Sequence, residues 1–235
     1  MALLVFVFFS LSLADKSSAS GPRIFLPQTE WDFGYIPQGS SVSHIFWIKN
    51  TGDDTLQILK VRSGCTCTYA PLNKDILAPQ ESTYLEAIFN SRNYEGLKNM
   101  TIAIFSTDTS TISDVYFSVN VENEIPLVQI NPHQIKFDSS EIGENPQRKA
   151  VITNKSNTVL HIAIAEEPEE IVDYKLVHKD LSPKEEAELI FSIAPKGSPG
   201  SFQTNLTLDF FEGSPGQGEK KLRYTLPISG TIVSK

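Results

Sequence analysis

One sequence pattern occurs twice in this chain, and this repeat constrains the fold more than any other feature. Residues 24–58 (IFLPQTEWDFGYIPQGSSVSHIFWIKNTGDDTLQI) align with residues 128–162 (VQINPHQIKFDSSEIGENPQRKAVITNKSNTVLHI). Equivalent positions lie about 104 residues apart and include Trp31-Asp32 with Phe137-Asp138, Asn50 with Asn154, Leu56 with Leu160, Ala78-Pro79 with Ser182-Pro183, and Ile88-Phe89 with Ile190-Phe191. About 100 residues is the usual size of one small domain. The repeat therefore predicts two divergent domains, residues 21–125 and 126–235, joined near residues 123–128.

Each copy is built from short runs in which apolar and polar residues alternate. In residues 41–50 (SVSHIFWIKN), alternate positions from Val42 to Ile48 share one face, and an Asn-Thr-Gly-Asp turn follows. This period of two is typical of half-buried β-strands. About seven such strands per hundred residues, with turns at regular spacing, predict an all-β fold of two tandem immunoglobulin-like β-sandwich domains.

Residues 1–20 (MALLVFVFFSLSLADKSSAS) have the pattern of a signal peptide. Their apolar run ends at Ala14, too short to cross a bilayer, which takes about 20 helical residues, and small residues suited to cleavage follow it. We predict cleavage between Ala14 and Gly21 and export to the periplasm or the extracellular space. No later apolar run is long enough to span a membrane and no cysteine lies near the cleavage region, so we expect neither a transmembrane segment nor a lipid anchor.

The chain is acidic, with a formal net charge of −8 at pH 7. The acidic residues are spread over both copies and no basic stripe is present, which argues against nucleic acid as a partner. The densest charge run, residues 166–170 (EEPEE), lacks the D-x-D-x-D-G spacing of a calcium loop. We expect this run to be a solvated loop.

The first copy carries a characteristic series of motifs. These are Trp31-Asp32-Phe33-Gly34, the strand and turn from Phe46 to Gly52, Cys65-Thr66-Cys67-Thr68, and Leu77-Ala78-Pro79. In this order they resemble the bacterial secreted family called domain of unknown function 1573 (DUF1573), related in pattern to the immunoglobulin-like domains of major sperm protein and hydin. Thr66 and Gln80 stand where that family commonly has glycine. The resemblance covers residues 29 to about 125. The second copy matches the same pattern more weakly and contains no cysteine. The resemblance implies fold and export, because the family's activity is unassigned.

Four residues of these motifs are predicted to be structural. Gly34 permits a sharp bend in the first strand, and Asn50 and Gly52 let the chain reverse, because Asn and Gly tolerate positive φ. Pro79 has no backbone N–H and so interrupts sheet pairing between two strands. We interpret Gly34, Asn50, Gly52 and Pro79 as a turn motif rather than as parts of a binding site.

Cys65 and Cys67 are the two cysteines of the chain, and more than one chemical state is open to them. In an extended strand their Cα atoms would lie nearly 7 Å apart, about the limit for a disulfide, and a turn at Ser63-Gly64 would bring them closer. Two neighbouring thiols seldom stay free in an oxidising compartment. An internal disulfide is therefore the leading hypothesis, beside structural packing and intermolecular pairing.

Metal binding is the alternative that gives the cysteines a chemical role. Two thiolates in C-x-C can hold a soft ion such as Cu(I), whereas zinc would require two further ligands. His44 and Met100 are the candidate additional ligands in the first domain. A thiol-redox site is less favoured, because no helix N-terminus follows this strand to lower the pKa of a thiol.

The sequence contains none of the common catalytic motifs. G-x-S-x-G, H-E-x-x-H and the P-loop are missing, and the other histidines are scattered over the second copy. We therefore expect a binding or scaffold protein rather than an enzyme, acting on a protein partner of unknown identity. Strand addition along a sheet edge is a recognition mode open to such domains. The candidate edge strands are residues 24–33 and residues 114–122.

Overall fold

The structure is a computed structural model that describes residues 21–110, 113–194, 199–213 and 218–234. The predicted signal peptide, residues 1–20, lies outside the described residues. Every regular element in the described part of the chain is a β-strand. The strands are β1 (Ile24–Phe25), β2 (Glu30–Ile36), β3 (Ser41–Asn50), β4 (Leu56–Ser63), β5 (Thr68–Tyr69), β6 (Ile76–Leu77), β7 (Ser82–Asn90), β8 (Gly96–Ser106), β9 (Ser113–Val121), β10 (Val128–Asn131), β11 (Ile135–Glu141), β12 (Gln147–Asn154), β13 (Leu160–Glu166), β14 (Val172–Leu176), β15 (Asp180–Leu181), β16 (Glu186–Ile193), β17 (Gly200–Glu212) and β18 (Glu219–Val233). Over these residues, the search for a helix with the length and apolarity of a bilayer span finds none.

The first domain is a sandwich of two sheets, in the order β1-β3-β7-β5 and β2-β9-β8-β4-β6. Strands β3 and β7 pair antiparallel over their full length, from Ser41 with Asn90 to Lys49 with Ser82. Burial alternates along both strands, as the period of two predicts. The inner faces enclose an apolar core whose largest side chains include Phe33, Phe46, Phe89 and Leu85.

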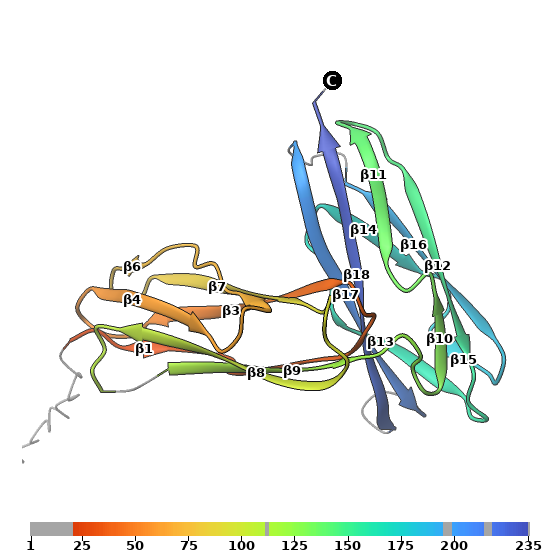
Figure 1. Ribbon diagram of the computed structural model, residues 1–235, viewed down its shortest axis with the longest axis horizontal. Coiled ribbons are helices and arrows are strands. Elements are labelled where there is room, and N and C mark those ends of the chain that lie inside the picture. The colour runs from red at the N-terminus through yellow and green to blue at the C-terminus, as the bar shows by residue number, and fades with distance from the viewer. Residues whose placement is uncertain (1–20, 111–112, 195–198, 214–217, 235) are drawn as a thin grey trace, which may run out of the picture.

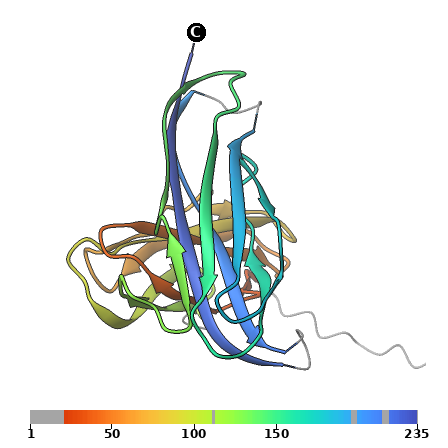
Figure 2. The ribbon, with the colours of Figure 1, turned by 90° about the vertical axis from the view of Figure 1, so that its right-hand side faces the viewer.

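The second domain repeats this plan with its own core. One sheet has the order β10-β12-β16-β14, and the other contains β15, β13, β17 and β18, with β11 parallel to β18. Its core includes the fully buried side chains of Ile152, Phe191, Phe210 and Tyr224. Two separate cores and the all-strand composition confirm the predicted class of tandem immunoglobulin-like β-sandwiches. In Figure 1 the second domain stands across one end of the first, and Figure 2 shows the same arrangement from the side.

The predicted turn motif has the same hydrogen bonds in both domains. The Asn50 amide donates to the carbonyls of Asp54 and Leu77, and the Asn154 amide donates to those of Thr158 and Leu181. Both asparagines are fully buried. Each side chain thus ties the turn after one strand to a neighbouring loop, which is the physical reason for asparagine at this position of the repeat.

The turn after Pro79 adopts the backbone conformation that a glycine favours. Gln80 has φ of 66°, and Lys184, at the equivalent place after Pro183, has φ of 69°. The backbone N–H of each residue donates to the carbonyl of its domain's buried asparagine, Asn50 or Asn154. Glycine is common in the family at this position because a left-handed conformation costs a side-chain-bearing residue more. In this chain the neighbouring hydrogen bonds hold the conformation without glycine.

We predict that Asn50→Ala and Asn154→Ala each lower the free energy of unfolding by about 1 to 3 kcal/mol, because each removes the donor to a buried carbonyl, that of Leu77 or Leu181. Urea unfolding measures the effect. The exposed Asn93 supplies the matched control, and Asn93→Ala should change stability by less than about 0.5 kcal/mol. Equal effects for all three variants would contradict the prediction.

The expectation that residues 24–33 and 114–122 form exposed sheet edges is largely wrong. Only β1, at the start of the first stretch, lies at an edge, beside β3. Strand β2 lies between β9 and β18, and β9 lies between β2 and β8. β9 is interior because β2 of the same domain pairs with it on the side away from β8. β2 is interior because the second domain docks on it, so that one sheet runs through both domains. A pattern within one repeat does not contain this information.

Candidate functional site

The two domains meet where β18 of the second domain lies beside β2 of the first. Tyr224 pairs with Tyr35 in parallel orientation, and the Thr225 hydroxyl donates to the carbonyl oxygen of Phe33 at 2.7 Å. Gly34, between these contacts, has φ of 64°, and a Cβ there would lie 2.2 Å from the carbonyl oxygen of Arg223. Gly34 therefore does more than bend its strand. It lets the backbones of the two domains touch.

Arg223 connects the two domains through its guanidinium group. Its Nε and Nη2 each donate to the carboxylate of Asp209 at 2.7 Å, and its Nη1 donates to the carbonyl oxygen of Asp32 at 2.9 Å. The group also lies 5.0 Å from the ring centroid of Trp31. The hydrogen bonds to Asp209, with the charge of that carboxylate, raise the pKa of Arg223. A bidentate pair of this kind fixes the orientation of the cation.

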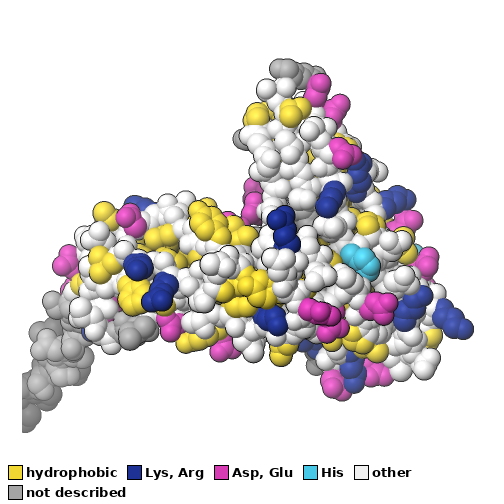
Figure 3. Space-filling model, viewed as in Figure 1, with side chains coloured by type: hydrophobic (Ala, Val, Ile, Leu, Met, Phe, Trp, Pro, Cys, Tyr) yellow, Lys and Arg dark blue, Asp and Glu magenta, His cyan; other side chains and the backbone are white. Residues whose placement is uncertain are grey.

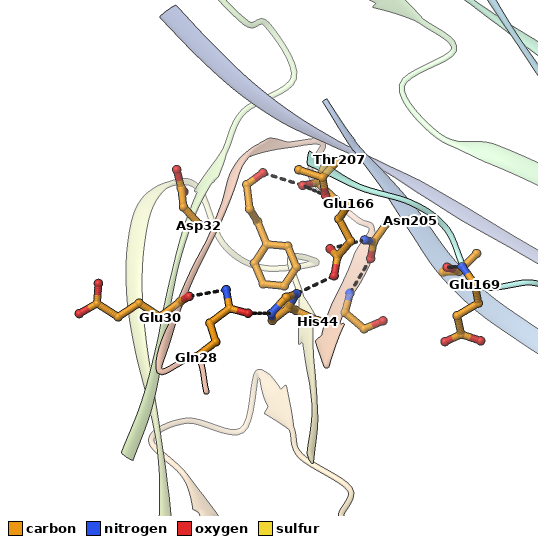
Figure 4. Close-up of polar contacts among 12 residues, drawn as sticks. Gln28, Glu30, Asp32, His44, Glu166, Glu169, Asn205 and Thr207 are labelled. Atoms are coloured by element: carbon orange, nitrogen blue, oxygen red, sulfur yellow. Dashed lines mark hydrogen bonds and ion pairs between the residues drawn. The ribbon is translucent and has the colours of Figure 1, made fainter. Parts of the chain in front are cut away.

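His44 is the centre of a polar cluster at the same junction, shown in Figure 4. Its Nδ1 lies 2.6 Å from a carboxylate oxygen of Glu166, and its Nε2 lies 3.3 Å from the Gln28 side-chain oxygen. The ring stacks on Trp31, with centroids 4.0 Å apart and planes 3° apart. His44 is only 7% exposed. The prediction that its strand face points inward is confirmed by this burial, and its partners come from both domains.

Asn205 closes this cluster from the second domain. Its side-chain oxygen accepts a hydrogen bond from the Ser43 backbone N–H at 2.7 Å, and its amide nitrogen lies 3.5 Å from Glu166. Ser43 is next to His44 in β3, so the second domain contacts two consecutive residues of the first domain. The second domain therefore contacts β3 as well as β2 of the first domain.

The interpretation of residues 166–170 as a solvated loop is wrong for Glu166. The side chain of this residue is 23% exposed, and one of its carboxylate oxygens lies 2.6 Å from the Nδ1 of His44. Burial, together with the negative charge of Glu86 in β7, raises the pKa of Glu169. Part of the acidic run therefore faces the first domain. Charge density alone could not show this, because the opposing residues lie about 80 to 120 positions earlier in the sequence.

A groove of about 610 Å³ crosses the boundary between the domains. Its lining includes Glu30 and Asp32 of β2, Asn99 of β8, Tyr116 and Ser118 of β9, and Arg223 of β18. Tyr116 is 44% exposed. On the face shown in Figure 3, hydrophobic side chains are exposed over the first domain, and charges of both signs are interspersed. The groove combines aromatic rings, hydrogen-bonding groups and charges, which suits recognition of a surface with both apolar and polar groups.

The cysteine loop connects β4 to β5. In the structure Cys65 and Cys67 are joined by a disulfide, with Cα atoms 5.3 Å apart. The Gly64 N–H donates to the carbonyl of Thr101, and the Asn90 N–H donates to the carbonyl of Cys67, so neighbouring strands hold both sides of the loop. The predicted turn lies slightly later than Ser63-Gly64, because Ser63 still belongs to β4 and the chain bends at Gly64-Cys65 and turns at Thr66-Cys67. This path brings the cysteines within the reach that a disulfide requires.

The structure separates the two candidate additional metal ligands. Met100, in β8, has its Sδ 3.9 Å from the Sγ of Cys65. His44 is instead engaged by Glu166, Gln28 and Trp31 at the domain junction. In the part of the chain that is described, no group of three or more His, Cys, Asp or Glu side chains is placed to hold a metal ion. A four-ligand zinc site therefore lacks its further ligands there.

A comparison with protein families identifies the family of the first domain. The family described as protein of unknown function (DUF1573) matches residues 24–121. Residues 24–121 form a DUF1573 domain. The resemblance in the motifs is thereby confirmed for the first domain. A sequence comparison with curated proteins finds no match.

The solved structures that match this chain are distant from it in sequence. A protein of unknown function from Porphyromonas gingivalis W83 is 13% identical, with a TM-score of 0.37, over 88% of this chain and 99% of that protein. The ASH/PapD-like domain 7 of human CEP192 is 15% identical, with a TM-score of 0.39, over 46% of this chain and 87% of that domain. WR4, a Caenorhabditis elegans MSP family member, is 11% identical, with a TM-score of 0.34, over 46% of this chain and 98% of that protein. With TM-scores below 0.5, these similarities carry no conclusion about this chain.

We predict that Gly34→Ala loosens the domain junction, because the added Cβ would clash with the backbone of Arg223. Gly39→Ala is the matched control, since Gly39 also has positive φ, 73°, but has nothing within 4 Å of an added Cβ. Gly39→Ala should cost about 1 to 2 kcal/mol for its backbone conformation alone. Gly34→Ala should cost more and should also increase the radius of gyration in small-angle scattering. Equal effects of the two substitutions would contradict the role of Gly34 at the junction.

We predict that Glu169→Gln stabilises the protein at neutral pH. The pKa of Glu169 is raised by burial and by Glu86, so ionisation of Glu169 is less favourable in the folded state than in the unfolded state. The gain should be at most about 1 kcal/mol, because solvent screens the pair. It should be largest above the folded-state pKa and vanish once pH falls below the ordinary glutamate range. Unfolding measured from pH 3 to pH 8 tests this, and a gain independent of pH would contradict it.

Proposed function

We propose that this chain is an exported binding or scaffold protein that holds a protein partner in the groove between its two sandwich domains. The observation that carries the proposal is the groove itself, which takes its lining from β2, β8 and β9 of one domain and from Arg223 of the other. A binding surface shared by two domains has a defined shape only when the domains are fixed relative to each other.

The junction supports such a fixed arrangement. The close approach at Gly34, the hydrogen bond from Arg223 to the Asp32 carbonyl and the His44 pair with Glu166 join different strands of the two domains. Breaking one of them would leave a buried or half-buried polar group without its partner, which is costly. We infer that the two domains present the groove as one preformed surface.

Export is part of the proposal, and it is supported by the signal-peptide pattern of residues 1–20. The expected compartment is the periplasm or the extracellular space. We further propose that the chain acts through binding and not as an enzyme. Its chemistry in the groove is that of recognition: three aromatic rings, carboxylates, amides, hydroxyls, a thioether and a guanidinium.

A crosslinking pull-down from the native cell envelope tests the partner-binding function. We expect the full chain to capture a protein whose recovery is lost with Tyr116→Ser, because Tyr116 lies in the groove. Tyr69→Ser is the matched control, since Tyr69 is 69% exposed on β5 and is not part of the groove lining. Capture that Tyr116→Ser leaves unchanged, or that Tyr69→Ser reduces equally, would contradict the proposal.

Metal handling through Cys65 and Cys67 is the second candidate function, ahead of thiol-redox exchange. The contact between Met100 and Cys65 favours it, because thioether and thiolate sulfur together are ligands for soft ions. This candidate does not depend on partner binding in the groove.

A further inference from the structure

Three of the four sulfur-containing residues of the chain lie together in the first domain. The sequence has two cysteines and two methionines. Cys65 and Cys67 share the loop after β4, and Met100 comes from β8, 35 residues beyond Cys65, with its Sδ 3.9 Å from the Cys65 Sγ. A disulfide sulfur carries no proton, so this approach is a contact between two sulfur atoms and not a hydrogen bond.

The spacing of these sulfurs suits an ion with three sulfur ligands. A metal–thiolate bond of about 2.3 Å places three ligands in a planar arrangement about 4 Å from one another. Met100 and Cys65 already have this separation. The Cα atoms of Cys65 and Cys67 are 5.3 Å apart, so rotation of the two side chains separates their sulfurs to a similar distance once the bond between them is broken.

The surroundings of the sulfurs favour a soft ion of low coordination number. Cys67 is 8% exposed, and Cys65 and Met100 pack against the same apolar core. The Thr68 hydroxyl lies 3.5 Å from the Cys65 Sγ and 3.8 Å from the Cys67 Sγ, where it can donate a hydrogen bond to a thiolate. Cu(I) prefers thiolate and thioether ligands.

A hollow beside the loop gives access from solvent, and an arginine in its lining supplies a positive charge. Its volume is about 480 Å³, and its lining includes Thr66, Cys67, Arg92 and Tyr94. One Cu(I) ion with two thiolates and a thioether has a net charge of −1. A neighbouring guanidinium favours such a negative centre over the neutral thiols.

We propose that the reduced protein binds one Cu(I) ion through Cys65, Cys67 and Met100, and that the disulfide is the closed form of this site. The proposal rests on the second candidate function, metal handling, and not on partner binding in the groove. Opening the site takes two electrons from a thiol reductant. Two reductant thiols form a disulfide and give their protons to the sulfurs of Cys65 and Cys67. Binding of Cu(I) then releases these two protons to solvent.

The test is an anaerobic titration of the full chain with Cu(I) against a chromophoric Cu(I) chelator, with X-ray absorption of the loaded protein. We expect one Cu(I) per reduced chain with three sulfur ligands, and no binding by the disulfide form. Met100→Leu keeps the side-chain volume but removes the thioether. It should weaken Cu(I) binding by at least about tenfold, the loss that even outer-shell changes can produce, and should leave two sulfur ligands.

Ile102→Leu is the matched control, because Ile102 is the next inward-facing residue of β8 and contains no sulfur. It should bind Cu(I) as the wild type does. Failure of the reduced chain to bind Cu(I), equal binding by the disulfide form, unchanged affinity in Met100→Leu, or nitrogen or oxygen ligands in the wild-type spectrum would each overturn the proposal. X-ray absorption of the wild type gives this answer even if a variant does not fold. Met100 also lines the groove, so Cys65→Ser, at a residue outside the groove lining, separates the two functions. It should abolish Cu(I) binding and keep the partner captured in the pull-down.

Discussion

The backbone contact between Gly34 and Arg223 is the interaction on which the arrangement of the two domains depends. A side chain at position 34 would occupy the place of the Arg223 carbonyl, so β18 could not approach β2. With glycine there, Tyr224 pairs with Tyr35, Thr225 reaches the Phe33 carbonyl, and Arg223 reaches the Asp32 carbonyl. The His44 and Glu166 pair lies at the same junction. The groove exists because these contacts bring parts of both domains to one surface.

The two candidate sites use the first domain in different ways. The groove is lined by residues of β2, β8 and β9, Met100 among them, and needs the second domain for Arg223. The sulfur cluster is built within the first domain, from the loop after β4 and from Met100 of β8. Because it needs nothing from the second domain, a cysteine-free second copy is compatible with its chemistry. A role for the pair beyond core packing fits the fact that the repeated fold forms in that copy without it.

Several features of the fold could be predicted because their causes are local. The alternation in β3 and β7 fixes which side chains face the core, and the repeat places Asn50 and Asn154 at equivalent turns. The predictions of an exposed edge strand and of a solvated acidic loop were wrong because they concern segments that contact distant parts of the chain. Residues 114–122 are an interior strand because β2, about 80 residues earlier, pairs with β9 on the side away from β8, and Glu166 leaves solvent because His44 lies opposite it. Composition and spacing within one repeat carry no record of such contacts.

The sequence by itself determined an all-β chain of two immunoglobulin-like domains and the DUF1573 motifs of the first domain. It also determined that Cys65 and Cys67 are the candidate residues for a chemical role. These follow from periodicity, turn preferences and residue type, which act over a few neighbouring positions. Only the tertiary structure decided that His44 belongs to the domain junction and that Met100 belongs beside the cysteines. The physical reason is that both placements depend on strand pairing between segments far apart in the chain, and a short window of sequence does not encode that pairing.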